Sequence, residues 1–97
     1  MNIVTLSGTL VGREAVRFTP AGIEVFEGTF HHRVTLKEAG RPRIVEFDFP
    51  AVSYGELANE LNQLPLGGDF VLKGFFAPRS SRSQRLIVHI TEYNSRS

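Results

Sequence analysis

The chain has 97 residues, of which 41% are hydrophobic and 22% charged, with a formal net charge of +1 at pH 7. This length predicts a single domain with one core over residues 1–93, followed by a frayed tail over residues 94–97. The absence of cysteine excludes disulfides and thiolate metal sites, and the absence of a long apolar run or a signal-peptide pattern predicts a cytoplasmic protein without a membrane span.

The first third of the chain is predicted to form two strands. Apolar alternation predicts a strand over residues 3–11, in which Gly8 marks a bend or a close backbone approach. The sequence Thr-Pro-Ala-Gly over residues 19–22 predicts a turn. A long strand follows over residues 23–36, and its apolar residues change parity near the start. We therefore expect a bulge within residues 25–28.

The remainder of the chain is predicted to contain three strands and one helix. The strands are expected over residues 43–49, 70–77 and 86–93. A connection over residues 37–42 precedes the first of them, and Pro50 is expected to end it. Ser53 followed by Glu56 fits a capping box, and leucines at helical spacing predict a short helix over residues 54–63.

The order of these elements predicts an all-β protein: three strands, a short helix, then two strands. This is the order of the OB-fold, a five-stranded Greek-key barrel, whose loops between strands one and two and between strands four and five flank an oligonucleotide-binding face. A five-stranded SH3-like barrel is the alternative, and the helix between strands three and four favours the OB-fold. The parity of the strands predicts that Phe26, Phe30, Phe47 and Phe49 lie in the core.

Three arginines lie in the predicted connection between the last two strands. Arg79, Arg82 and Arg85 are separated by small polar residues with no acid among them, and the intervening serines are expected to keep the loop mobile. Residues 77–97 contain four Arg and one Glu, whereas residues 1–76 contain seven Lys or Arg and nine Asp or Glu. This asymmetry predicts a cationic loop that binds a polyanion, since guanidinium groups pair with phosphates and stack on bases. A merely solvated loop is the alternative.

Other basic residues are candidates for the same binding surface. They are Lys37, Arg41, Arg43, Arg17 and Arg33. Glu46 and Asp48 are expected on the outer face of the third strand, where they would repel phosphate. The sequence therefore predicts binding that depends on arginine–phosphate contacts more than on aromatic stacking.

No combination of residues predicts catalysis or a bound cofactor. His31 and His32 are adjacent, so on a strand they point to opposite faces and do not share a metal ion. The chain has no nucleophile elbow, Walker loop or dinucleotide-binding fingerprint. We therefore expect a protein that is not an enzyme and binds no metal.

Several short segments, in their order and spacing, resemble the primosomal replication protein N family. They are residues 4–10, 19–23, 32–33, 38–40, 49–51, 73–75 and 88–90. That family is similar to a single OB domain of bacterial single-stranded DNA-binding proteins. The resemblance implies a homodimer that binds single-stranded DNA, stabilises a helicase and helps to assemble the primosome during replication restart.

The same resemblance assigns DNA contacts by position. It implies them for the arginines of the loop over residues 79–85 and for Arg17, Arg33 and Arg43. Positions that carry aromatic residues in the best-known members of the family hold Arg41 and Glu46 here, which predicts weaker, more electrostatic binding. Two alternatives remain: an OB module that binds proteins and has little affinity for nucleic acid, and an RNA-binding OB domain.

Overall fold

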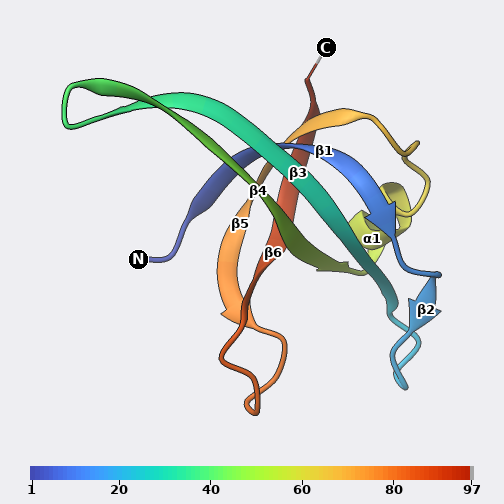
Figure 1. The fold of residues 1–97 in the computed structure, drawn as a ribbon. Helices are drawn as coiled ribbons and strands as arrows, with labels where there is room; N and C mark the ends of the chain where they lie inside the picture. The colour runs from blue at the N-terminus through green and yellow to red at the C-terminus, as the bar shows by residue number, and fades with distance from the viewer. Residues whose placement is uncertain (97) are drawn as a thin grey trace.

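The computed structural model describes residues 1–96, which form six strands and one short helix (Figure 1). The elements are β1 (Val4–Arg13), β2 (Arg17–Phe18), β3 (Glu24–Glu38), β4 (Arg41–Tyr54), α1 (Glu56–Leu61), β5 (Asp69–Pro78) and β6 (Leu86–Ser95). The strand order is β1-β5-β6-β4-β3-β2, and β1 also pairs with β3. This extra pairing closes β1, β3, β4, β5 and β6 into a barrel. The predicted five-stranded OB-fold, with a helix before its last two strands, is confirmed.

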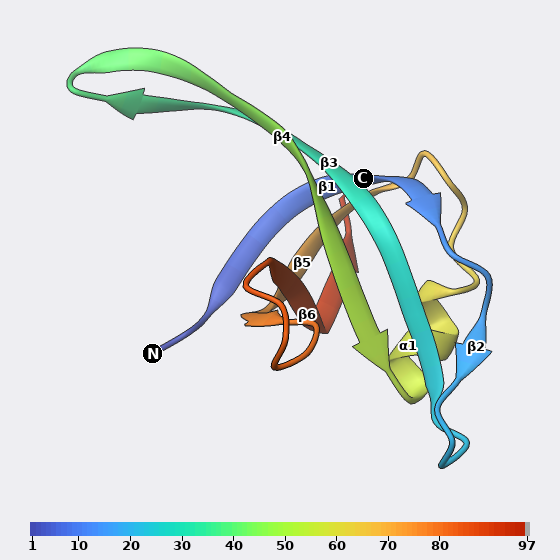
Figure 2. The ribbon, with the colours of Figure 1, turned by 60° about the horizontal axis from the view of Figure 1, so that its bottom comes forward.

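The long hairpin of β3 and β4 extends well beyond the barrel (Figures 1 and 2). Its ladder runs unbroken from Val25–Tyr54 to Glu38–Arg41, and the principal extents of the molecule are 50 × 33 × 21 Å. The predicted connection over residues 37–42 is wrong, because both strands continue to a tight turn. In that turn Ala39 and Gly40 have φ of 54° and 77°, the left-handed backbone that a two-residue hairpin favours.

The prediction that Pro50 ends the third barrel strand is also wrong. Pro50 pairs with Thr29 in the middle of β4, which continues to Tyr54. Pairing between β4 and β6 begins only at Ala51. The proline therefore lies where β4 has a hydrogen-bonded neighbour on one side only, a position that tolerates a missing N–H group.

The predicted bulge in residues 25–28 is not observed in β3. The irregularity lies in the paired strand β1, between Leu10 and Gly12. The change of apolar parity in β3 has another cause: Val25 is buried on the outer face of the sheet, where it packs with Val52 and Ile87. Both faces of β3 are thus apolar at its start, and no extra residue is needed to explain the pattern.

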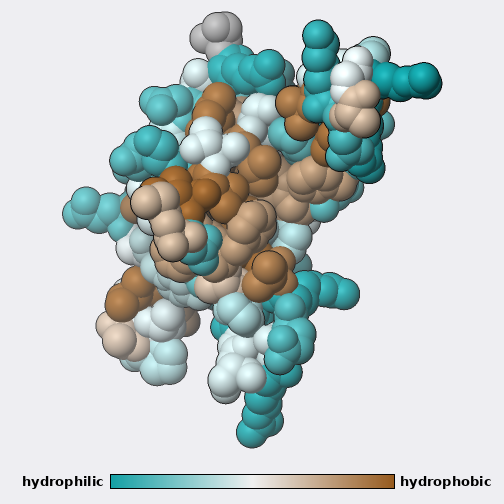
Figure 3. All heavy atoms as spheres, turned by 90° about the vertical axis from the view of Figure 1, so that its left-hand side faces the viewer, coloured by the Kyte–Doolittle hydropathy of each residue, from teal (hydrophilic) through white to brown (hydrophobic). Residues whose placement is uncertain are grey.

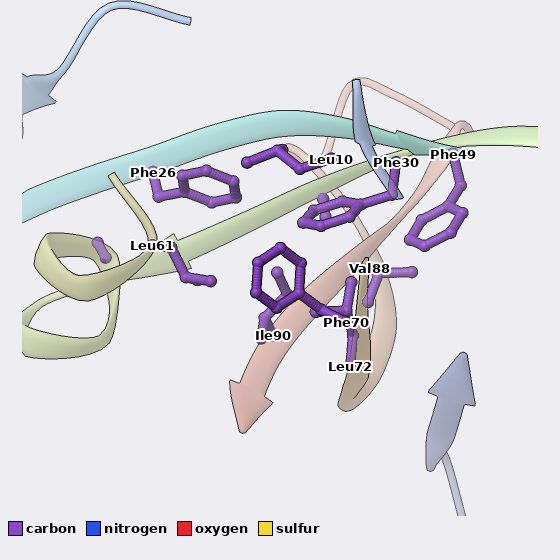
Figure 4. Packing of buried hydrophobic residues seen from close by; sticks show 11 residues of the cluster. Leu10, Phe26, Phe30, Phe49, Leu61, Phe70, Leu72, Val88 and Ile90 are labelled. Atoms are coloured by element: carbon purple, nitrogen blue, oxygen red, sulfur yellow. The ribbon is translucent and has the colours of Figure 1, made fainter. Parts of the chain in front are cut away.

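The barrel core contains four buried phenylalanines: Phe26, Phe30, Phe49 and Phe70 (Figure 4). Phe26 and Phe30 are fully buried, and Phe30 stacks on Phe49 at a centroid distance of 5.7 Å. These three predicted core residues are confirmed. Phe47 is not a core residue: it is 42% exposed, with its ring 5.0 Å from that of His32. Its partner His32 is still buried, so burial on the inward-facing side ends at the His32–Phe47 pair, where the hairpin leaves the barrel.

Helix α1 is shorter than predicted and is not capped by Ser53. Gly55 is the residue before the helix and provides no side-chain hydrogen bond, whereas Ser53 is a buried strand residue whose Oγ donates to the Ile90 carbonyl. At the other end, Arg13 Nη1 donates to the Leu61 and Leu64 carbonyls at 3.3 and 2.6 Å. Arg13 therefore supplies a charged donor to carbonyl groups at and just beyond the C-terminal end of the helix.

The barrel is held by a narrow parallel contact between β4 and β6. These strands pair only at Ala51–Val88 and Val52–His89. On its other side β6 pairs with β5 along its whole length, as far as Ser95, two residues beyond the domain boundary expected from the sequence. Residue 97 of the expected tail lies outside the described residues. Within residues 1–96, no helix is long and apolar enough to cross a membrane.

Candidate nucleic-acid interface

A groove crosses the outer face of β3 and β4 between two loops of the barrel. Its volume is about 350 Å³, and one wall is formed by the end of β1 and the segment after it, including Arg13 and Glu14. Thr29 and Pro50 form its floor, and Arg79, from the connection between β5 and β6, closes the other side. These are the two loops and the face that OB-folds use for oligonucleotides.

Two of the predicted DNA-binding arginines meet on one carboxylate in this groove. Arg17 Nη2 lies 2.8 Å from one oxygen of Glu27, and Arg79 Nη2 pairs with the other. The Glu27 side chain is 11% exposed, against 49% for Arg17 and 55% for Arg79. The acid-free neighbourhood of Arg79 in the sequence suggested that its charge is uncompensated. In the structure Arg79 is paired, because Glu27 reaches it from a strand that is distant in the sequence.

The loop over residues 79–85 has internal hydrogen bonds. The backbone N–H of Arg82 donates to Ser80 Oγ at 3.4 Å, and that of Arg85 donates to Ser83 Oγ at 3.1 Å. The serines thus form local turns that orient the arginines instead of merely loosening the loop. Arg82 and Arg85 have no ion pair within residues 1–96, and Arg85 lines a second hollow of about 260 Å³ beside Arg79.

The basic residues of the hairpin do not form one surface. Paired residues share a face, so Arg33 and Lys37 lie on the face of β3 that also forms the groove floor, whereas Arg41 and Arg43 lie on the opposite face. Arg43 is paired with Glu38 at 2.6 Å and Arg33 with Glu46 at 3.7 Å. The structure therefore brings together Arg17 and Arg79 but divides the hairpin group.

A histidine and two acids occupy the outer face where the hairpin leaves the barrel. His31 Nδ1 lies 2.6 Å from Asp48, and Nε2 lies 2.9 Å from Glu46. These two hydrogen bonds, that to Asp48 first, raise the pKa of His31 above its usual value of 6.5. When the ring is protonated, it partly neutralises the two acids that the sequence suggested would repel phosphate. Residues 1–96 contain no group of three His, Cys, Asp or Glu side chains that could hold a metal ion.

Tyr54 is a candidate interface residue that the sequence pattern did not indicate. Tyr54 pairs with Val25, which pairs with Arg17, so all three lie on the outer face. It is 49% exposed and is the only aromatic residue of β4 on this face. Position 54 was predicted to lie in the helix over residues 54–63. Alternation continued from Glu46 along a longer β4 would have placed Tyr54 on the outer face.

Comparisons with known proteins agree with this geometry. A family model described as "another single-strand binding protein family" matches residues 2–92. Replication restart protein PriB from Bordetella pertussis is 37% identical over 92 residues, covering 95% of this chain and 86% of its own. PriB from Nitrosomonas europaea is 32% identical over 91 residues, covering 94% and 84%.

A solved structure of PriB from Ralstonia solanacearum superposes with a TM-score of 0.89 at 31% identity, covering 100% of this chain and 99% of its own. The family resemblance found in the sequence segments is thereby confirmed. The chain belongs to the single-strand binding protein family matched by the model and, within it, to the replication restart proteins named PriB.

Proposed function

We propose that this protein binds single-stranded DNA without catalysing a reaction and acts as an accessory protein of replication restart. The observation that carries this proposal is the groove over β3 and β4, with arginines on the two loops that flank it. Guanidinium groups on both sides of a shallow polar floor suit a flexible polyanion better than a small molecule. The names of the relatives support the same process. We also propose that the protein acts in the cytoplasm, as the sequence suggested.

The bound DNA strand is proposed to run from the groove past the loop over residues 79–85. Arg82 and Arg85 contact phosphates, and Tyr54 offers one ring on which a base can stack. Arg33 and Lys37 continue the path along the hairpin, whereas Arg41 and Arg43 face away from it. Binding of this kind tolerates any sequence and weakens steeply with salt, because each phosphate contact releases counterions.

A homodimer is part of the proposal and is supported by an open strand edge. On the side of β3, β1 is paired only from Thr9 to Arg13, so in one copy of residues 1–96 the edge over residues 4–8 has no partner on that side. Ile3, Phe75 and Phe76 are exposed nearby, and Asn2 is hydrogen-bonded to the Phe76 backbone. Figure 3 shows apolar side chains gathered on the side of the N-terminus. A second copy would cover both features.

The homodimer is tested by light scattering after gel filtration. The wild type is expected at twice the chain mass, and Ile3→Glu, which places a charge in the apolar patch, is expected to shift it toward the monomer. A monomeric wild type would remove the homodimer from the proposal and leave DNA binding untouched.

The surface that receives a helicase or another primosome protein is proposed to lie outside the groove, so that DNA and partner bind together.

Fluorescence anisotropy of labelled poly-dT, measured at several salt concentrations, tests the central proposal. The variant carries Arg79→Ala, Arg82→Ala and Arg85→Ala. With about −0.7 in log–log slope per phosphate neutralised on a single strand, its slope is expected to be shallower by roughly 2. No binding by the wild type at low salt would favour a protein-binding module. Preference for an RNA oligonucleotide of the same length would favour an RNA reader that uses the 2′-hydroxyl.

A further inference from the structure

Glu27 is an anion in the groove where the proposed function needs the anion of a ligand. Each of its carboxylate oxygens pairs with one guanidinium, from Arg17 on β2 and from Arg79 beyond β5. A phosphate uses the same donors in the same way as a carboxylate does. The DNA-free protein therefore already holds an internal anion between the two loops that flank the groove.

We propose that Glu27 is a built-in competitor of DNA phosphate. In the DNA-free protein its carboxylate holds the loop over residues 79–85 across the outer face, and a phosphate takes its place on Arg79 when DNA binds. This inference rests on the proposed function, because it names the group that DNA must displace. It also gives the loop two positions, one held by Glu27 and one held by the DNA strand.

The position of each arginine in the fold decides which ion pair is exchanged. Glu27 is mostly buried, so a carboxylate left without any partner would be costly, and it must keep one arginine. Arg17 lies on β2, whose pairing with β3 at Val25 fixes its position beside Glu27. Arg79 begins a loop and uses only Nη2 on Glu27, so an entering phosphate can reach its remaining N–H groups first. Arg79 is therefore exchanged, and Arg17 stays.

Glu27→Gln tests this inference, with Glu14→Gln as its matched control. Glutamine can still accept a hydrogen bond from Arg17 but no longer holds Arg79 by charge. Glu14 lines the same groove, so Glu14→Gln removes the same charge without breaking a pair found within residues 1–96. In the poly-dT titration, Glu27→Gln is expected to bind about two- to fivefold tighter than wild type, the range expected for one exchanged surface ion pair. Glu14→Gln is expected to gain less.

Equal gains in the two variants would mean that only the net charge matters, and this would overturn the competition. Weaker binding by Glu27→Gln would also overturn it, because Glu27 would then hold Arg79 in its DNA-binding position. A double-mutant cycle gives the sharpest result. Arg79→Gln is expected to weaken binding more in the Glu27→Gln background than in wild type, because in wild type part of the Arg79 charge is already used.

Trypsin cleavage after Arg82 and Arg85 in the DNA-free protein gives an independent readout. Both Glu27→Gln and Arg79→Gln are expected to speed this cleavage, whereas Glu14→Gln is not. Unchanged cleavage in both would overturn the idea that Glu27 holds the loop. Faster cleavage, with no DNA binding by wild type or Glu27→Gln, would overturn the proposed function and the competition while retaining the contact. Melting curves of all variants confirm that they fold.

Discussion

The groove and the protruding hairpin both carry basic residues, but they hold them in different ways. In the groove, Arg17 and Arg79 are fixed by a mostly buried carboxylate above a packed barrel. On the hairpin, Arg43 and Arg33 pair with acids that are themselves about half exposed or more, and the basic side chains divide between two faces. The comparison shows that the number of basic residues in a segment does not reveal whether those residues form a binding surface. Basic side chains can act together only where the fold holds them on the same face.

The largest difference between the two regions is expected in stability. Phe30→Ala empties the centre of the aromatic core and is expected to cost about 3–5 kcal/mol of unfolding free energy. Phe47→Ala removes the same atoms from the half-exposed root of the hairpin and is expected to cost about 1 kcal/mol or less. Denaturant unfolding measures both values. Equal losses would show that the hairpin is as much a part of the core as the barrel.

Arg13 separates structural from binding arginines within the groove itself. Arg13→Met keeps the stem but removes the charged donor to the Leu61 and Leu64 carbonyls, which is expected to cost about 1.5–3 kcal/mol of unfolding free energy. Its affinity for poly-dT is expected to stay close to that of wild type. Arg82→Met is the control: it is expected to weaken binding and to leave the free energy of unfolding nearly unchanged, because the Arg82 side chain has no ion pair within residues 1–96. A large loss of affinity in Arg13→Met would place its guanidinium on the DNA.

Two double variants compare the free cations of the regions at equal change in charge. Arg82→Ala with Arg85→Ala is expected to make the log–log salt slope for poly-dT shallower by about 1.4, since Arg85 lines the hollow beside Arg79 and Arg82 lies in the same loop. Lys37→Ala with Arg41→Ala is expected to change it by about 0.7 at most, because these two residues lie on opposite faces. If the hairpin pair had the larger effect, the proposed path of the strand would be wrong.

The smallest expected effect is a pH dependence at the boundary of the two regions. The carboxylates of Asp48 and Glu46 raise the pKa of His31, so the folded protein favours the protonated ring. This contribution to stability is complete below the unfolded pKa of about 6.5 and is lost as pH rises through the folded value. The wild-type melting temperature should therefore fall over that range relative to His31→Gln. Parallel pH profiles would contradict this role of His31.

The topology could be predicted because each strand has its own pattern of alternation and each turn its own residues. The order of elements, the buried Phe26, Phe30 and Phe49, and the position of the basic loop all follow from local sequence. Strand ends could not be predicted in the same way. Gly40 and Pro42 are both residue types that favour turns, and only cross-strand pairing shows that the turn is confined to Ala39 and Gly40.

The details of the candidate site depend on contacts between distant segments, which a single sequence does not reveal. Glu27 and Arg79 are far apart in the chain, so their pairing could not be foreseen from the acid-free surroundings of the loop. Likewise, Arg13 gives no sign in sequence that its guanidinium serves the end of α1. Residue types in the loop predicted a cationic surface, whereas the barrel decides which of those cations are already engaged.

The narrow parallel contact between β4 and β6 has a consequence for local opening of the barrel. Ladder pairing between these strands is confined to Ala51–Val88 and Val52–His89, whereas each strand pairs with its other neighbour through a long antiparallel ladder. Transient separation there exposes few backbone amides and leaves each sheet half intact. Because Pro50 and Ile87 lie beside this seam and line a hollow next to Arg79, such fluctuations would widen the groove without unfolding the barrel.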